Sequence, residues 1–320
     1  MFPQENTKEK ILALLTVILL FLFVGILFIG ISINNKEKTA ALKRQVLKIR
    51  ADKEIAAKLN QTQLATSTVP QLTSKSFLTM VVTNNGTKKI LAQKNLDEVL
   101  PIASITKLMT AVIILENIKL ETEIKATRDY IGLEESTFVL ETDKIYTVKE
   151  LLANMLISSD NDSARLLSST LGEVNFIAKM NLKAKELGLT KTNYFNVTGL
   201  DPDKSSNEVN VSSANDLANL LIYIKNKHPK ILELTANPSY GFCDINNYCK
   251  TVTSTDKFLN DKDFKFKIVG GKTGSTDLAQ KNLALIIEPI DDITIINIVL
   301  GAKDNFLDTE SLINNITINK

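Results

Sequence analysis

The feature of this sequence that most limits its fold is an apolar run near the N-terminus, from Ile11 to Ile33, which contains no charged residue. As a helix with a rise of about 1.5 Å per residue, the run would be roughly 34 Å long and could cross a lipid bilayer. A secretory signal peptide has a shorter apolar core and a cleavage site with small residues, and neither is evident here. We therefore predict an uncleaved single-span membrane anchor at residues 11–33, preceded by a short tail at residues 1–10.

Residues 34–75 are predicted to form a helical stalk and linker between this anchor and a globular domain at residues 76–320. The segment after the anchor is rich in Lys and Arg, and the positive-inside tendency would place such a segment in the cytoplasm. Long domains cross membranes largely regardless of flanking charge, and the chemistry discussed below requires the domain outside. The net charge of the whole chain is only +2, which argues against binding of nucleic acid through its phosphates.

The domain has strand-like segments at both ends and helical segments between them. SFLTMVVT and KKILAQK are predicted strands near its start, and FKFKIVGGKTGST, LALIIE and DITIINIVLGA are predicted strands near its end. Helices are predicted at Val148–Leu156, from Ser163 to Leu171, and at Phe176–Leu187, Asp216–Ile224 and Asp308–Ile316. We therefore expect an α/β fold of the α+β type, in which the terminal strands share one antiparallel sheet with helices packed on it.

Ser104 and Lys107 lie three residues apart in PIASITKLMTA, at the start of a predicted apolar helix. This spacing places both side chains on one helix face, so that an amine lies beside a hydroxyl. A serine hydroxyl is a weak nucleophile until a base takes its proton, and a lysine can be that base when its pKa is lowered towards neutrality. The pair recurs at Ser254 and Lys257, where we expect no chemistry, so the spacing alone is weak evidence.

One histidine and two cysteines are too few for an ordinary zinc site, and we expect no metal and no other cofactor. The histidine, His228, lies in KNKHPK at a predicted exposed helix end, which leaves little room for a Ser-His-Asp triad. Cys243 and Cys249 bracket a predicted hairpin tip in GFCDINNYCK. In an exported protein they would form a local disulfide, and two free cysteines are the alternative.

Two further motifs follow Ser104 in order. Ser159-Asp160-Asn161 could by itself be a helix cap, and Lys272-Thr273-Gly274 could be a glycine turn at a strand end. Together, S-x-x-K, S-x-N and K-T-G on a strand form a set found in penicillin-binding proteins and class A β-lactamases. LLANMLISSDNDSARLL, MNLKAKELGLTKTNYFNVTGL, SSANDLANL, GGKTGST and IVLGA extend the likeness. From about Ser76 to Ile316 the chain resembles the low-molecular-mass penicillin-binding proteins, the serine D-alanyl-D-alanine carboxypeptidases of peptidase family S11.

This resemblance implies a β-lactamase/transpeptidase-like fold and a serine peptidase mechanism. Ser104 would attack the carbonyl of the penultimate D-alanine, with Lys107 as general base. Ser159 would relay the proton to the leaving D-alanine. The other implied residues bind the substrate. Asn161 would bind the substrate amide, and Lys272 and Thr273 of the K-T-G motif, which ends at Gly274, would bind the terminal carboxylate. The backbone N–H groups of Ser104 and Ser275 would bind the oxyanion.

The resemblance also implies partners and a location. Peptidoglycan stem peptides would be the substrates, and β-lactam antibiotics would be covalent inhibitors. The protein would be a single-pass protein of the bacterial plasma membrane with its catalytic domain on the extracytoplasmic side. Only 46 residues follow Gly274, so we expect no β-rich C-terminal domain and expect the N-terminal span to provide the anchor.

The sequence departs from the family pattern at three places. Glycine is usual at the position of Gln280, histidine is frequent at that of Asn210, and arginine often stands where Phe306 and Leu307 follow the last strand. Three other functions share the motifs. A D,D-endopeptidase that cuts cross-links would use the same site. A class A β-lactamase would need a glutamate in an E-x-x-L-N loop, which we do not find, and a penicillin-binding sensor would be acylated without turnover.

Overall fold

The structure, a computed structural model, describes residues 37–38, 43, 63–64, 72–83, 86–132, 140–203, 206–290, 293–314 and 316–317. The predicted anchor at residues 11–33 and most of the predicted stalk lie outside these residues. No helix among the described residues is both long and apolar enough to cross a membrane. The chain divides into two compact units, Met1–Ala57 and Lys58–Lys320. Glu37, Lys38 and Lys43 of the first unit are helical, and the following paragraphs concern the second.

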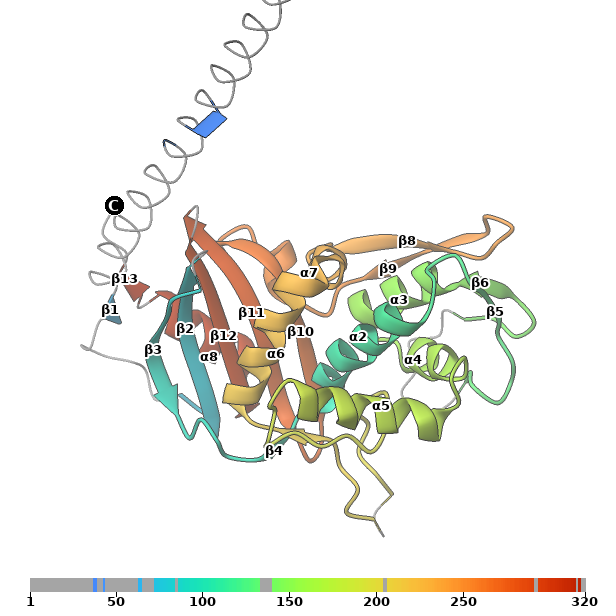
Figure 1. Cartoon of the computed structure of the whole chain (residues 1–320), viewed down its shortest axis with the longest axis horizontal. Coiled ribbons are helices and arrows are strands. Elements are labelled where there is room, and N and C mark those ends of the chain that lie inside the picture. Colours follow the sequence, from blue (N-terminus) through green and yellow to red (C-terminus); the bar gives the residue numbers. More distant parts are fainter. Residues whose placement is uncertain are drawn as a thin grey trace, which may run out of the picture. The chain divides into compact units, whose positions relative to one another are not determined.

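A five-stranded antiparallel sheet forms one half of the second unit, with the strand order β10-β11-β12-β2-β3 (Figure 1). The sheet joins the two ends of the domain, because β12 pairs with β2 along its length. The prediction of one sheet made from N- and C-terminal strands is therefore confirmed. The strands are β2 (Ser76–Thr83), β3 (Lys88–Lys94), β10 (Lys267–Thr276), β11 (Gln280–Ile290) and β12 (Ile293–Ala302).

Helices cover both faces of this sheet. Because side chains alternate along a strand, neighbouring residues of β12 enter different parts of the core. Ile296 and Ile298 belong to the large cluster that includes α6 (Ala214–Lys227). Ile295 packs instead in a cluster with Ile313 of α8 (Asn305–Asn314). All residues of β12 are buried, as expected for a central strand between two layers of helices.

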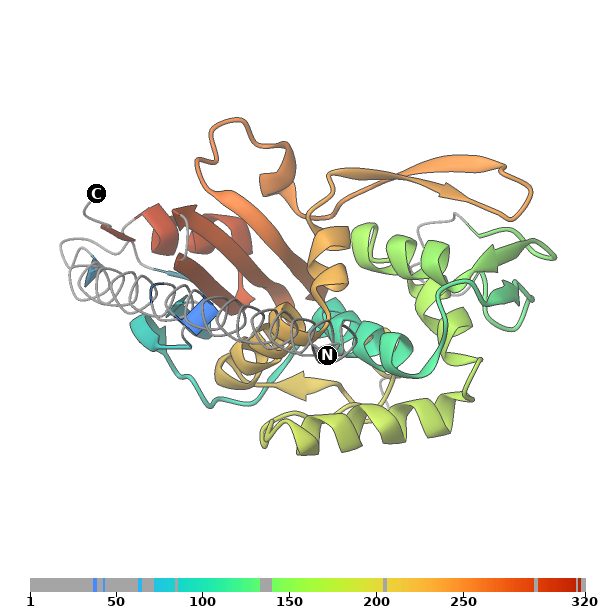
Figure 2. The ribbon, with the colours of Figure 1, turned by 45° about the horizontal axis from the view of Figure 1, so that its top comes forward.

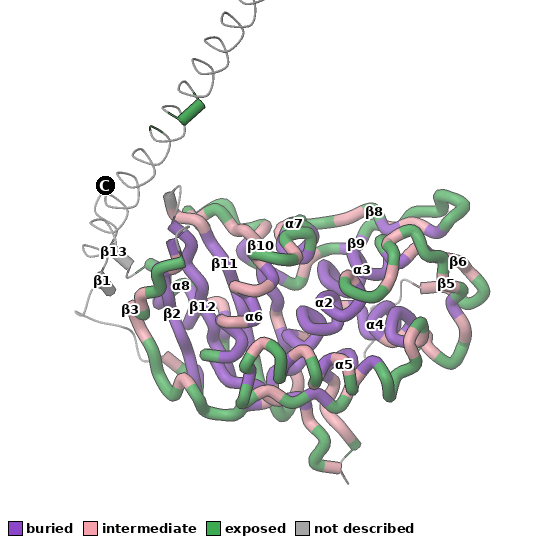
Figure 3. The backbone as a smooth tube through the Cα atoms, viewed as in Figure 1, coloured by how far each residue is buried: buried purple, intermediate pink, exposed green. Residues whose placement is uncertain are grey.

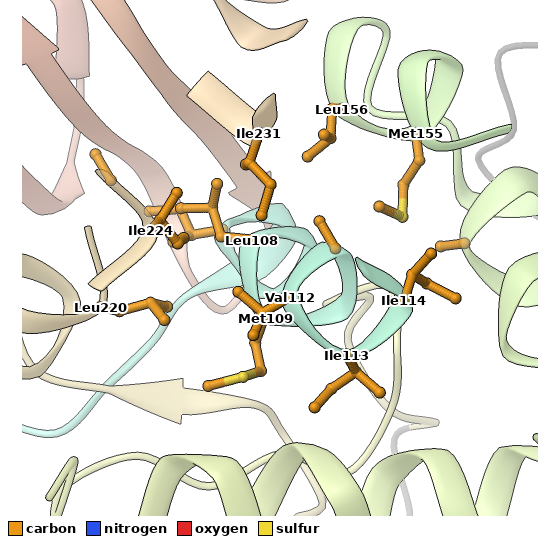
Figure 4. Packing of buried hydrophobic residues seen from close by; sticks show 14 of the residues in the cluster. Leu108, Met109, Val112, Ile113, Ile114, Met155, Leu156, Leu220, Ile224 and Ile231 are labelled. Carbon is orange, nitrogen blue, oxygen red and sulfur yellow. The ribbon is translucent and has the colours of Figure 1, made fainter. Parts of the chain in front are cut away.

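The helical half of the unit is built around α2 (Lys107–Asn117), whose residues from Lys107 to Ile114 are all buried. A helix that is apolar on every side must be surrounded by protein. Figure 4 shows Leu108, Val112 and Ile114 of α2 within a shell of apolar side chains from other helices, and Figure 3 shows the same helix as a buried core. The surrounding helices are α3 (Val148–Ile157), α4 (Asn161–Ser168), α5 (Glu173–Glu186), α6 and α7 (Pro229–Thr235).

Short elements complete the unit. Figure 2 shows that β8 (Ser239–Cys243) and β9 (Cys249–Thr253) form a long hairpin beside α3. Cys243 and Cys249 face each other at its tip and are joined by a disulfide. The remaining strand pairs are β4 (Leu100–Pro101) with β7 (Val211–Ser212), β5 (Glu123–Lys125) with β6 (Ile145–Thr147), and β1 (Gln63–Leu64) with β13 (Ile316–Thr317). The 3₁₀ helices are η1 (Ala103–Thr106) and η2 (Lys257–Asn260).

Several predicted boundaries are wrong by a few residues. The helix after the S-D-N motif ends at Ser168 rather than Leu171. The last helix starts at Asn305 rather than Asp308, because the Asp304 carboxylate accepts the backbone N–H groups of Phe306 and Leu307 and so caps the helix.

Candidate active site

Ser104 lies in η1, a 3₁₀ turn that leads directly into α2. The predicted α-helix therefore begins only at Lys107. The residue before Ser104, Ala103, has a positive φ of 49°, which is a strained backbone conformation for a residue with a side chain. Such conformations persist where the surrounding structure holds them, and they cluster at functional sites.

Lys107 is fully buried beneath Ser104. Its Nζ atom lies 2.8 Å from Ser104 Oγ and donates hydrogen bonds to Asn161 Oδ1 at 2.6 Å and to the Thr198 carbonyl at 2.8 Å. Three acceptors from three segments of the chain fix the amine in place. The distance to Ser104 Oγ is within the range that a general base needs.

The Thr198 carbonyl is a site contact that the sequence analysis did not identify. The nearest sequence signal is Gly199, which follows Thr198 in NVTGL, but it does not single out the carbonyl. Gly199 has a φ of +86°, and a Cβ atom there would lie only 1.9 Å from the Ala103 carbonyl oxygen. Only glycine allows this segment to approach the turn that carries Ser104.

Ser159 lies in the tight connection between α3 and α4 and has a positive φ of 64°. The connection is fixed from both sides. Ser158 Oγ donates to the Asn154 carbonyl at 2.8 Å, and the Asp160 carboxylate accepts the Ser163 N–H at 2.7 Å. The S-D-N motif therefore does cap a helix, through Asp160, and the same turn places Ser159 and Asn161 on either side of the cap.

The K-T-G motif lies in β10, against η1. A Cβ atom at Gly274 would lie 2.7 Å from the Ile102 carbonyl oxygen and 3.1 Å from Ser104 N, so glycine is needed for this approach. The Thr273 hydroxyl forms a hydrogen bond with the Thr255 hydroxyl. Lys272 is buried, and its Nζ donates to the Thr273 carbonyl at 3.1 Å.

Burial lowers the pKa of Lys272 to about 7, and the negative charge of Asp256 opposes this shift. The main cause of the lowered pKa is desolvation. Burial raises the pKa of Asp256 to about 6. Its Oδ1 accepts the Phe258 N–H at 3.0 Å, whereas its buried Oδ2 has no hydrogen-bond partner among the described residues. The sequence analysis did not identify Asp256.

A cleft of about 360 Å³ opens at these motifs. Lys107 and Lys272 are buried and are not among the residues that line it. Unpredicted lining residues include Thr255, Lys257 and Lys281. The predicted site residues that line the cleft are Ser104, Ser159, Asn161, Thr273, Gly274 and Ser275.

Other residues singled out in the sequence lie elsewhere. Cys243, Cys249 and His228 do not line the cleft, and the His228 Nε2 atom lies 3.1 Å from Glu116 Oε1. Within the described part of the chain, no group of three or more His, Cys, Asp or Glu side chains could hold a metal ion.

The three departures from the family pattern have distinct structural settings. Gln280 has a positive φ of 57°, a conformation in which glycine is unstrained. Asn210 is buried, accepts the Phe195 N–H at 2.6 Å and donates to Thr106 Oγ1 at 3.0 Å, so it holds loops together behind η1. Phe306 lines the cleft and, unlike the arginine frequent in the family, brings no charge to it.

Comparisons with known proteins agree with this geometry. The family model for D-alanyl-D-alanine carboxypeptidase matches residues 63–304. The chain is 37% identical to the D-alanyl-D-alanine carboxypeptidase DacF of Bacillus subtilis over 43% of its own length and 36% of that protein. It is 32% identical to a D-alanyl-D-alanine endopeptidase of Pseudomonas aeruginosa over 62% of its length and 63% of that protein. The matches thus span about a third of the first relative and less than two thirds of the second.

Among solved structures, penicillin-binding protein D2 of Listeria monocytogenes in its ampicillin-bound form is similar, with a TM-score of 0.65 and 30% identity. The likeness covers 77% of this chain and 98% of that one. The fold, the three motifs at one cleft and the family match over most of the domain lead to one conclusion: the chain belongs to the D-alanyl-D-alanine carboxypeptidase family of serine peptidases, family S11.

Proposed function

We propose that this protein is a serine D-Ala-D-Ala carboxypeptidase that removes the terminal D-alanine from peptidoglycan stem peptides. The observation that carries the proposal is the buried Lys107 amine, which lies 2.8 Å from Ser104 Oγ and 2.6 Å from Asn161 Oδ1. In this arrangement Ser104 is the nucleophile, Lys107 is a base within reach of it, and Asn161 orients the base. An activated serine needs these three groups.

In the acylation step, Ser104 Oγ attacks the carbonyl carbon of the penultimate D-alanine and gives its proton to the Lys107 amine, which lies 2.8 Å away. The oxygen of the tetrahedral intermediate becomes negative, and the backbone N–H groups of Ser104 and Ser275 stabilise it. The peptide C–N bond then breaks. Ser159 donates its proton to the leaving nitrogen and takes up the proton held by Lys107, and free D-alanine departs from an ester on Ser104.

In the deacylation step, a water molecule attacks the ester carbonyl. The C–O bond to Ser104 breaks, the proton lost by the water returns to the serine oxygen, and the shortened peptide is released. Asn161 contacts the peptide amide and, through its 2.6 Å bond from Lys107, holds the base in position. The Thr273 hydroxyl and the Lys272 side chain bind the terminal carboxylate. Lys272 binds it most strongly while its amine is protonated.

We also propose that β-lactam antibiotics acylate Ser104 and inhibit the enzyme. The similar Listeria protein is described in an ampicillin-bound form, which supports this proposal. A β-lactamase activity has less support, because the cleft has no glutamate among its described lining residues to activate a deacylating water.

A D,D-endopeptidase activity on peptide cross-links is the second candidate. The similar protein of Pseudomonas aeruginosa is named as an endopeptidase, and the same cleft chemistry would serve both reactions. The two activities differ only in whether the amine released is free D-alanine or a cross-linked residue.

The proposed location is the extracytoplasmic side of the bacterial plasma membrane, with residues 11–33 as a single-span anchor in the lipid bilayer. Stem peptides lie outside that membrane, so the reaction requires this side. The carboxypeptidase proposal predicts release of D-alanine from a pentapeptide-stem substrate. Cleavage of a cross-linked dimer without D-alanine release from the pentapeptide would favour the endopeptidase, and labelling by a fluorescent penicillin without either product would favour a sensor.

A further inference from the structure

Lys281 lies beside the reacting groups but has no role in the mechanism above. It is directly opposite Ser275 in the antiparallel ladder between β11 and β10. Side chains of directly opposed residues emerge on the same face of a sheet, with Cβ atoms about 5 Å apart. Both Ser275 and Lys281 line the cleft. Lys281 therefore lies at the end of the K-T-G strand, on the face of the sheet that borders the cleft.

Lys281 is the lining cation with the fewest other contacts. The other lining lysine, Lys257, lies over the Phe306 ring at 5.5 Å from its centre. The lining acid Asp304 accepts two backbone N–H groups at the start of α8, from Phe306 at 3.0 Å and Leu307 at 3.1 Å. The side chain of Lys281 has no hydrogen-bond or ion-pair partner among the described residues, and the residue is exposed. It is therefore available to a ligand.

The carboxylate of a peptide substrate needs a cation that is reliably charged at neutral pH. Lys272 is buried, and its pKa of about 7 leaves it only partly protonated there. Lys281, in contrast, is exposed to water at the cleft. A cation at the cleft mouth can attract an anion and guide its entry, whereas the buried one can bind it only after entry.

We propose that Lys281 is a substrate-binding residue that selects peptides with a free C-terminal carboxylate and directs that carboxylate towards Thr273. This proposal rests on the proposed function and adds a specificity determinant to the same cleft. It predicts that Lys281 contributes to the binding of anionic substrates and contributes little to acyl transfer itself.

The test compares two acyl donors with the full-length protein in detergent. One is a D-Ala-D-Ala peptide with a free carboxylate, and the other is a thioester of the same acyl group with an uncharged leaving group. The variants are Lys281→Gln, Lys281→Arg and, as a matched control, Lys303→Gln, which removes an exposed lysine that does not line the cleft.

We expect Lys281→Gln to raise KM for the peptide about fivefold, the effect of one exposed charge pair, with kcat changed less than twofold. The thioester kinetics should be unchanged, Lys281→Arg should restore the peptide KM, and Lys303→Gln should have no effect. A peptide KM for Lys281→Gln equal to that of the unaltered protein would overturn the proposal, as would an equal loss with both donors. If the unaltered protein cleaved neither donor, the proposed function itself would fail, which is a distinguishable result.

Discussion

The Nζ atom of Lys107 donates a 2.6 Å hydrogen bond to Oδ1 of Asn161, 54 positions later in the chain. Both residues are buried, so water competes little for this bond. It connects α2, which follows Ser104, to α4, which begins at the last residue of the S-D-N motif. This contact links Lys107, the proposed base, directly to the second motif.

Asn161→Ala removes the acceptor from Lys107 and should slow acylation of Ser104 by about 100-fold, because a mispositioned general base loses much of its effect. The rate of labelling by a fluorescent penicillin measures this. Asn175→Ala is the control, since it makes the same change at an exposed helix position. Equal rates for Asn161→Ala and the unaltered protein would mean that the hydrogen bond does not orient the base.

Gly274→Ala should impair both folding and activity, because its Cβ would lie 2.7 Å from the Ile102 carbonyl and force β10 away from η1. We expect a loss of about 1–3 kcal/mol in the free energy of unfolding, as for other overpacked sites. Gly241→Ala adds the same methyl group where nothing lies within 4 Å, and should have little effect. Urea denaturation and penicillin labelling measure the two properties, and similar behaviour of the two variants would contradict the close approach of β10.

The pH dependence of substrate binding should follow the protonation of Lys272. Its pKa of about 7 means that it is protonated below pH 7 and loses its charge above it. The KM of a carboxylate-terminated peptide should therefore rise as the pH increases from 6 to 8, by at most about tenfold per pH unit above the pKa.

Asp256→Asn tests the cause of this dependence. The ionised Asp256 raises the pKa of Lys272, and Asp256 itself is ionised above its own pKa of about 6. Without this charge the pKa of Lys272 falls further, so the rise in KM should move to lower pH. The pH profile of KM for the two proteins provides the measurement, with Asp263→Asn as an exposed control. A shift to higher pH would show that Asp256 does not favour the charged lysine.

Replacing both cysteines of the β8–β9 hairpin by serine should lower the free energy of unfolding by at most about 2–3 kcal/mol, because the bridge closes a loop of only a few residues. D-alanine release should be unchanged, since neither cysteine lines the cleft. Chemical denaturation and the release assay measure the two effects. A large loss of activity with unchanged stability would indicate that the hairpin contributes to the site.

The sheet could be predicted from the sequence because its strands have regular signals. SFLTMVVT and KKILAQK correspond residue for residue to β2 and β3, and the three C-terminal strands are separated by recognisable turns. The start of α8 was misplaced because its cap, Asp304, precedes the apolar pattern by several residues.

The motif residues were identifiable because their order and residue types are specific. The contacts that complete the site were not. The Thr198 carbonyl is a backbone atom and leaves no side-chain signal. Asp256 becomes important only through burial near Lys272, and Lys281 only through its register opposite Ser275. Both depend on tertiary packing, which local patterns do not encode.

The most direct test of the proposed function is D-alanine release from a pentapeptide-stem substrate by the full-length protein and its Ser104→Ala variant. Residue 104 is partly exposed at the cleft, so this change should leave the fold intact, as circular dichroism would verify. We predict steady release by the unaltered protein and none above background by Ser104→Ala. Release that persists in a folded Ser104→Ala variant would contradict the assignment of Ser104 as the nucleophile.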